Sequence, residues 1–201
     1  MLKVAVAKFG EVWFGVVCTE QKIFASAFAE TEEETLHYLQ EKVPANQAFQ
    51  MVSEDSAGVK SCLLLMKKAC DENVSVDNVL SLERFPIYTQ HVLRAVARIP
   101  VGYVASYGGV AEAVGGGARA VGNVMASNAF APLVPCHRVI TSSLGLGGYG
   151  GGLRVKFALL RREKRGFAQK REVMVEGGVL QVFPVEKVLE RLAAKVPWRD
   201  L

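Results

Sequence analysis

The run LVPCHRVI, residues 133–140, places a cysteine directly before a histidine in an otherwise apolar stretch. A free cysteine has a pKa of about 8.5, so little thiolate forms at neutral pH unless a base or a positive field stabilises the anion. An activated nucleophile therefore needs a base within reach and a third group to orient that base. Cys136 and His137 are the candidate nucleophile and base. Found singly, each residue type is more often an inert core residue, so the pair alone does not define a reaction.

The other three cysteines, Cys18, Cys62 and Cys70, show no CxxC spacing and no accompanying cluster of histidines. This pattern disfavours both a structural zinc site and a secreted disulfide framework. We therefore expect reduced thiols, no bound metal and no cofactor.

A glycine-rich run, GLGGYGGGLRVKFALLRREKRG, follows the cysteine by a few residues. It contains neither a GxxxxGK[ST] motif nor a GxGxxG turn framed by a strand and a helix, so a nucleotide site is not expected. Glycines without that frame more plausibly let the backbone approach another group closely.

Charge is divided unevenly along the chain. Residues 1–80 hold 7 Lys and Arg against 12 Asp and Glu, whereas residues 81–170 hold 12 against 3. The overall net charge of +4 therefore conceals an acidic segment followed by a basic one. A basic module beside an acidic scaffold is typical of nucleic-acid binding, and chance asymmetry of a solvated surface is the alternative.

The length of 201 residues, half of them hydrophobic, suits one large or two small domains with a sizeable core. No uninterrupted apolar stretch reaches roughly 18 residues, the length of a membrane-spanning helix. The first ten residues contain two lysines and too short an apolar run for a signal peptide. We expect a monomeric cytoplasmic protein without membrane contact.

The elements before residue 86 predict a sheet with helices. Apolar runs broken by polar turns predict an antiparallel meander over residues 1–30. Thr31, followed by Glu34 three residues later, predicts a capped amphipathic helix, and GVKSCLLLMKKACDE predicts a second helix that carries Cys62 and Cys70 on its apolar face. Residues 73–86 are predicted to be a linker.

The elements after residue 86 are mainly helical. YTQHVLRAVARI predicts a helix that stops at Pro100, and Ser106 can cap a short helix that ends at a Gly115–Gly117 turn. A second helix then runs to about Asn128, so the spacing is that of a helix-turn-helix, although many helical hairpins contain glycine. EVMVEGGVLQV predicts a Gly-Gly hairpin, and residues 185–196 predict an amphipathic helix.

Four segments together carry a family resemblance. PCHRV (135–139), read with IPVGYVASY (99–107), ARAVGNVMASN (118–128) and GYGGGLRVKFALLRRE (148–163), resembles the O6-alkylguanine-DNA alkyltransferase family with that family's spacing. The resemblance covers roughly residues 86 to 166, and the PCHRV run is its most specific part.

The resemblance implies an α+β protein in three parts. Residues 1–80 would form a ribonuclease-H-like domain of antiparallel sheet and helices. Residues 81–170 would form a helical, winged-helix-like DNA-binding domain that contains the helix-turn-helix. Residues 171–201 would be an extension made of the hairpin and the last helix.

The resemblance also implies roles for five catalytic residues. Cys136 would attack the alkyl carbon on guanine O6 and keep the alkyl group permanently. His137 would take the cysteine proton through a water, and Glu163 would orient and stabilise His137. Asn128 would join the DNA-reading helix to the cysteine loop, and Tyr107 would give a proton to the departing guanine ring.

The implied partner is double-stranded DNA that contains O6-alkylguanine, mainly O6-methylguanine, with O4-methylthymine as a second candidate. The target atom lies inside the duplex, so the base must be flipped out, and Arg119 matches the finger that fills the gap. Further DNA-binding residues would be Ser106, Ala118, Ala120, Gly122, Ala126 and Ser127. The pocket for the flipped base would be lined by Met125, Val139, Tyr149, Gly150, Gly151 and Lys156.

Three other functions remain as alternatives. A binding protein of the same fold would recognise alkylated guanine without repairing it, but such relatives lack the cysteine. A cysteine hydrolase would need an oxyanion hole and would turn over repeatedly. A helix-turn-helix transcription factor would leave Cys136, His137 and Glu163 idle. The preferred prediction is a DNA repair protein, a single-turnover methylated-DNA–protein-cysteine methyltransferase.

Overall fold

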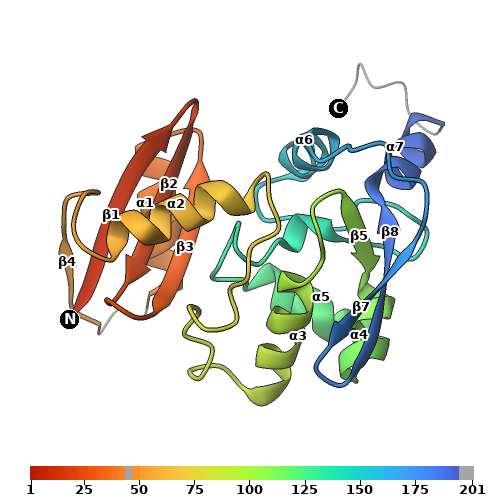
Figure 1. The fold of residues 1–201 in the computed structure, drawn as a ribbon, viewed down its shortest axis with the longest axis horizontal. Coiled ribbons are helices and arrows are strands. Elements are labelled where there is room, and N and C mark those ends of the chain that lie inside the picture. The colour runs from red at the N-terminus through yellow and green to blue at the C-terminus, as the bar shows by residue number, and fades with distance from the viewer. Residues whose placement is uncertain (44–46, 195–201) are drawn as a thin grey trace. The chain divides into compact units, whose positions relative to one another are not determined.

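The computed structural model describes residues 1–43 and 47–194, and within them the strands form two four-stranded sheets. Figure 1 shows the helices that accompany them. The described chain divides into two compact units. One contains residues up to 85 together with 129–134, and the other contains 86–128 and the residues from 135 onward. Helices accompany both sheets and most of the strand pairs are antiparallel, so the architecture is mixed α+β, as predicted.

The predicted meander forms the sheet of the first unit. Strands β1 (Leu2–Phe9), β2 (Val12–Cys18) and β3 (Ile23–Ala29) pair antiparallel in sequence order. The first turn contains Gly10 with φ of 64°, a left-handed conformation that glycine adopts without a steric penalty. The alternating apolar residues of these strands supply the buried core of the unit.

Two helices and one short strand complete this unit. Helix α1 (Glu32–Lys42) begins as predicted at Thr31, whose hydroxyl accepts a hydrogen bond from the Glu34 backbone N–H at 3.2 Å. Helix α2 (Val59–Ala69) contains Cys62, and both Cys62 and Cys70 are half-buried. Strand β4 (Phe49–Met51) pairs parallel to β1 and was not predicted, because three exposed residues show no strand periodicity.

The prediction of a linker over residues 73–86 is wrong. Ile23 donates its backbone N–H to the Val79 carbonyl at 2.6 Å, and Ser81 donates to the Ile23 carbonyl at 2.8 Å. Leu80 is buried and forms a parallel bridge with Ile23. This segment therefore extends the core of the first unit, because its pairing with β3 is non-local and leaves no local signature.

Residues 129–134 also belong to the first unit, although the predicted boundary placed them in the DNA-binding domain. Ser26 donates its backbone N–H to the Ala129 carbonyl at 2.8 Å. Phe130 is fully buried, its ring lies 5.8 Å from the Phe85 ring, and the Arg84 guanidinium lies over it at 5.7 Å. The chain thus leaves the second unit just after the helix-turn-helix and returns to it just before Cys136.

The second unit contains the three predicted helices. They are α3 (Ile87–Ala97), α4 (Tyr107–Val114) and α5 (Ala118–Ala126). As predicted, Ser106 caps α4 by accepting a hydrogen bond from a backbone N–H, and glycines 115 to 117 separate α4 from α5. Helix α5 ends two residues earlier than predicted, so Asn128 lies beyond its end.

The sheet of the second unit assembles strands from distant parts of the sequence. Strand β5 (Tyr103–Ser106) pairs parallel with β6 (Val139–Ile140) and antiparallel with β8 (Gly178–Pro184). Strand β7 (Arg171–Val175) joins β8 in the predicted hairpin. Val175 pairs with Gly178, so the turn consists of Glu176 and Gly177 and not of the two glycines.

Two further helices pack in this unit. Helix α6 (Leu153–Arg162) follows the glycine-rich loop, and helix α7 (Val185–Ala193) follows β8. Leu160 and Val188 meet in one buried apolar cluster. The sequence predicted this last helix over residues 185–196, and the last two residues of that prediction, 195 and 196, lie outside the described residues. Along the part of the chain that is described, no helix is both long and apolar enough to cross a membrane.

Candidate functional site

The cysteine and histidine lie on one turn of 3-10 helix, Cys136–Arg138, directly after Pro135. The proline ring fixes φ, and Arg138 closes the turn by donating its backbone N–H to the Pro135 carbonyl at 2.8 Å. Strand β6 then pairs with β5, which anchors the turn to the sheet. His137 and Arg138 are buried, whereas Cys136 is half-buried.

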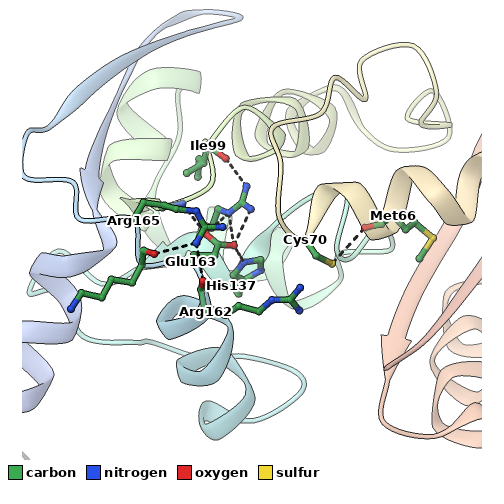
Figure 2. A network of polar contacts seen from close by, with 10 residues as sticks. Met66, Cys70, Ile99, His137, Arg162, Glu163 and Arg165 are labelled. Carbon is green, nitrogen blue, oxygen red and sulfur yellow. Dashed lines mark hydrogen bonds and ion pairs between the residues drawn. The ribbon is translucent and has the colours of Figure 1, made fainter. Parts of the chain in front are cut away.

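Glu163 lies directly after the last residue of α6, and its carboxylate accepts several hydrogen bonds. His137 Nε2 is 2.7 Å from Glu163 Oε1, and Arg138 donates from Nε and Nη2 at 2.9 to 3.0 Å. Figure 2 shows His137 and Glu163 within this network of polar contacts. The Gly102 backbone N–H donates to Oε2 at 3.1 Å. Glu163 is only 3% exposed, so this carboxylate is a buried, saturated acceptor.

The charge states of Glu163 and His137 follow from these contacts. Burial raises the pKa of Glu163, but the hydrogen bonds and charges of His137 and Arg138 outweigh it and lower that pKa to about 2. Burial lowers the pKa of His137, although Glu163 acts in the opposite direction. An ionised carboxylate can only accept, so Nε2 of the neutral imidazole carries the hydrogen and Nδ1 keeps the lone pair. His137 is thus arranged as a base.

Arg138 is a site residue that the sequence analysis did not single out. Its Nη1 donates to the Ile99 carbonyl at 2.8 Å, while its other nitrogens hold Glu163. The side chain is buried and keeps Glu163 ionised and fixed in orientation. The only signal in the sequence was its position next to His137, because the partner carboxylate lies 25 residues away.

We expect Arg138→Met to destabilise the fold strongly. It leaves the buried Glu163 carboxylate without its cation, and breaking a buried ion pair costs about 3 to 5 kcal/mol. Urea unfolding measures the change in the free energy of unfolding. Lys60→Met, which breaks the exposed pair between Lys60 and Asp55, is the matched control and should change little. Similar effects in the two variants would show that the buried cluster does not support the fold.

Cys136 is surrounded by groups that act on its thiol in opposite directions. Burial raises the pKa of Cys136, while a hydrogen bond from the Asn128 side chain and the positive charge of Lys156 lower it. Burial dominates, so the resting group is a thiol and not a thiolate. Nucleophilic attack therefore requires a base that removes the proton.

Lys156 is fully buried on α6 beside Cys136. Its Nζ donates to the Val139 carbonyl at 2.6 Å and to the Gly148 carbonyl at 3.2 Å, so it joins the cysteine turn to the glycine-rich loop. Burial lowers the pKa of Lys156 to about 8, with Cys136 acting against that shift. The rings of Tyr107 and Tyr149 each lie 5.9 Å from the ammonium. Lys156 thus supplies positive charge where a thiolate would form.

Tyr107, the first residue of α4, completes this cluster. Its hydroxyl donates to the Gly148 carbonyl at 3.4 Å, and burial, followed by the influence of Cys136, raises its pKa. Gly147 has φ of 69°, and a Cβ there would lie 2.9 Å from the Tyr107 ring. The glycine-rich loop therefore approaches a side chain closely, as predicted, and a larger residue at this position would have to displace the Tyr107 ring and adopt a disfavoured left-handed backbone conformation.

The predicted residues of α5 differ in their exposure. Arg119, in the first turn of α5, is exposed, and among the hydrogen bonds and ion pairs of the described residues none joins it to Cys136, His137 or Glu163. Met125 is buried. The exposed or half-buried predicted DNA-binding residues are Ser106, Ala118, Ala120, Gly122, Ala126 and Ser127. Of the predicted pocket residues, Val139 is buried, Tyr149 is half-buried, and Gly150 and Gly151 are exposed.

Within residues 1–43 and 47–194, no group of three or more His, Cys, Asp or Glu side chains is placed to hold a metal ion.

The class of this unit follows from comparison with known proteins. The family described as "6-O-methylguanine DNA methyltransferase, DNA binding domain" matches residues 87–165, the stretch that holds the helix-turn-helix, the cysteine turn and Glu163. This part of the chain is a DNA-binding domain of that class. The relatives described next are similar to this same part of the chain or, for the solved structures, to most of its length.

Two curated relatives illustrate the match. A methylated-DNA–protein-cysteine methyltransferase of Mycobacterium leprae is 52% identical over 79 residues, which are 38% of this chain and 48% of the relative. The enzyme of the same name from Pyrobaculum aerophilum is 39% identical over 94 residues, 47% of this chain and 63% of the relative. The chain thus spans about half the length of the first of these relatives.

Solved structures extend the similarity beyond the matched domain. The O6-methylguanine-DNA methyltransferase of Pyrococcus kodakaraensis superposes with a TM-score of 0.63 at 28% identity, over 81% of this chain and 99% of that one. The Mycobacterium tuberculosis protein OGT, crystallised in complex with DNA, superposes with a TM-score of 0.62 at 25% identity, over 81% and 92% of the two chains.

Proposed function

We propose that this protein repairs O6-alkylguanine in double-stranded DNA by transferring the alkyl group to Cys136. The arrangement of side chains around Cys136 is the main support for this proposal. The Cys136 thiol is hydrogen-bonded to Asn128 and lies near Lys156, and the adjacent His137 is hydrogen-bonded to the ionised Glu163. This arrangement lies within a domain of the DNA methyltransferase class.

The reaction is a displacement at the alkyl carbon. The proton of Cys136 passes to His137, sulfur forms a bond to the carbon, and the bond between that carbon and guanine O6 breaks. Tyr107 gives a proton to the departing guanine ring, so guanine leaves as a neutral base, and the Tyr107 phenolate then regains a proton from solvent. Glu163 stabilises the imidazolium formed on His137, and Lys156 stabilises the transient thiolate. The thioether is not cleaved again, so each molecule reacts once.

The DNA substrate reaches Cys136 only after the damaged base leaves the stack. In the proposal α5 enters the minor groove, where its small residues allow a close approach to the duplex. Arg119 at the start of α5 fills the gap left by the flipped base. Support comes from the exposure of Arg119 and from the relative that was crystallised in complex with DNA.

We also infer the finer architecture of the two units. The meander flanked by α1 and α2 supports a ribonuclease-H-like first unit. Helices α4 and α5, followed by the β7–β8 hairpin, support a winged-helix-like second unit.

The direct test uses a duplex oligonucleotide with one O6-methylguanine. Mass spectrometry of the digested protein should show one added methyl on the peptide that contains Cys136. Repaired DNA should reach a plateau at one equivalent per protein molecule. A linear time course over many turnovers would support the hydrolase alternative, and DNA binding without a mass increase would support the transcription factor or the non-repairing binding protein.

We expect Glu163→Gln to slow methyl transfer and to move its pH profile upward. The Glu163 carboxylate raises the pKa of His137, so its loss leaves the imidazole less able to hold the proton from Cys136. Measuring the single-turnover rate constant between pH 6 and 9 tests this, with DNA affinity measured in parallel. A pH profile that coincides with that of the unaltered protein would show that Glu163 has no part in the proton transfer.

A further inference from the structure

We propose that the C-terminal segment 171–194 positions Glu163, through the corner formed by Val185 and Glu186, and that Glu186 is a positioning residue for the reaction. The inference rests on the proposed function for its effect on rate. The contacts themselves lie in the second unit and do not depend on that function.

Glu186, in the first turn of α7, holds the loop that directly follows Glu163. Its Oε1 accepts hydrogen bonds from three consecutive backbone N–H groups, those of Arg165 at 3.0 Å, Gly166 at 2.6 Å and Phe167 at 3.1 Å. Gly166 has φ of 77°, and this left-handed residue lets successive N–H groups converge on one anion. The loop therefore forms a nest for an anion, and Glu186 fills it.

The second oxygen of Glu186 also bears on the contact between Oε1 and the three backbone N–H groups. Glu186 Oε2 is buried and has no hydrogen-bond partner among the described residues. An unpaired buried oxygen carries a desolvation cost. The other oxygen of the same carboxylate, Oε1, accepts three hydrogen bonds from the loop. We infer that these three hydrogen bonds stabilise the fold by more than the buried Oε2 destabilises it.

Val185, the neighbour of Glu186, supports Glu163 from the other side. Its backbone N–H donates to the Gly102 carbonyl at 2.9 Å, and the Gly102 N–H in turn donates to Glu163 Oε2 at 3.1 Å. A Cβ on Gly102 would lie 2.8 Å from the Phe167 ring and 3.2 Å from the Glu163 carbonyl oxygen. Two successive residues of the C-terminal segment thus reach Glu163, one through the following loop and one through Gly102.

A ring stack ties these two contacts together. Phe167 lies 5.0 Å from the Tyr103 ring in a stacked arrangement, and the Arg171 guanidinium lies over both rings. Tyr103 is the residue after Gly102, and Phe167 is the last of the three donors to Glu186. Glu163 donates its backbone N–H to the Leu159 and Leu160 carbonyls of α6, and this packing holds the chain that follows it and supports the direction of the carboxylate that orients His137.

The test compares Glu186→Ala with Glu190→Ala, a matched loss of an exposed glutamate from the same helix. Two quantities are measured in the full chain: the proton NMR signal of His137 Nε2–H, and the single-turnover rate of methyl transfer against pH. For Glu186→Ala we expect the signal to move upfield, because the hydrogen bond to Glu163 loosens. We also expect the rate to fall by about tenfold, the lower end of what is lost when a hydrogen-bond partner behind a functional histidine is removed, with the pH profile moved upward. Glu190→Ala should match the unaltered protein.

The NMR signal separates the failure of this inference from the failure of the proposed function. If the unaltered protein transfers no methyl group, the proposed function fails, and the signal still tests the positioning. Should Glu186→Ala not fold, Glu186→Gln keeps an acceptor oxygen with weaker bonds, and a smaller upfield shift is expected. An unchanged signal in a folded variant at Glu186 overturns the inference, and so does an equal change in Glu190→Ala.

Discussion

Cys136→Ser is expected to abolish methyl transfer and to leave the affinity for DNA unchanged. A serine hydroxyl has nearly the size of the thiol, so the turn and its hydrogen bonds should persist. The hydroxyl does not ionise near neutral pH, and the burial that raises the pKa of the thiol disfavours an alkoxide even more. The measurement is the methyl mass on the peptide with residue 136, beside a binding titration on duplex DNA.

Cys70→Ser is the matched control for this experiment. Cys70 is a half-buried thiol in the first unit, where it donates to the Met66 carbonyl. This variant should take up one methyl group at the rate of the unaltered protein. Methyl transfer by Cys136→Ser would place the nucleophile at another residue, and loss of DNA affinity in that variant would mean that the thiol also supports the binding surface.

Arg119→Ala is expected to slow the repair of duplex DNA far more than the reaction with a free base. If the side chain fills the gap left by the flipped nucleotide, its loss leaves an unstacking cost of about a few kcal/mol without compensation. A free-base substrate such as an O6-benzylguanine analogue needs no extrusion. The rate on duplex DNA divided by the rate on the free base is the quantity to measure.

Arg191→Ala removes the same charge from an exposed position on α7 and serves as the control for net charge. It should leave the ratio of the two rates unchanged. Equal slowing of Arg119→Ala on both substrates would show that Arg119 supports the pocket or the fold and has no separate role in base flipping. The glycine turn before α5 would then be the first feature to reconsider.

Elements with a local signature could be predicted from the sequence. The meander follows from alternation of apolar residues over the first 30 positions, and α1 follows from the Thr31 cap. The Ser106 cap and the glycines after Val114 defined α4 and α5 in the same way. In each case the determining residues are neighbours along the chain.

Features that depend on distant partners could not be predicted from patterns. Strand β6 has two residues and exists because β5 lies beside it. The role of Arg138 depends on Glu163 and on the Ile99 carbonyl, which no spacing rule connects to it. The family resemblance supplied Cys136, His137 and Glu163 as a set, but the contribution of Arg138, which together with His137 lowers the pKa of Glu163, became visible only in three dimensions.

The return of residues 129–134 to the first unit limits how this protein can be divided. A fragment that begins at residue 86 would carry Phe130, Leu133 and Val134, all at most 2% exposed, without the rest of the unit to which they belong. Such a fragment would present apolar surface in the short stretch between Asn128 and Cys136, and we expect it to aggregate. The DNA-binding part of the chain therefore cannot be transferred to another protein by itself. Recombination or truncation at residue 85 separates residues 1–85 from residues 129–134, and these two segments belong to one compact unit.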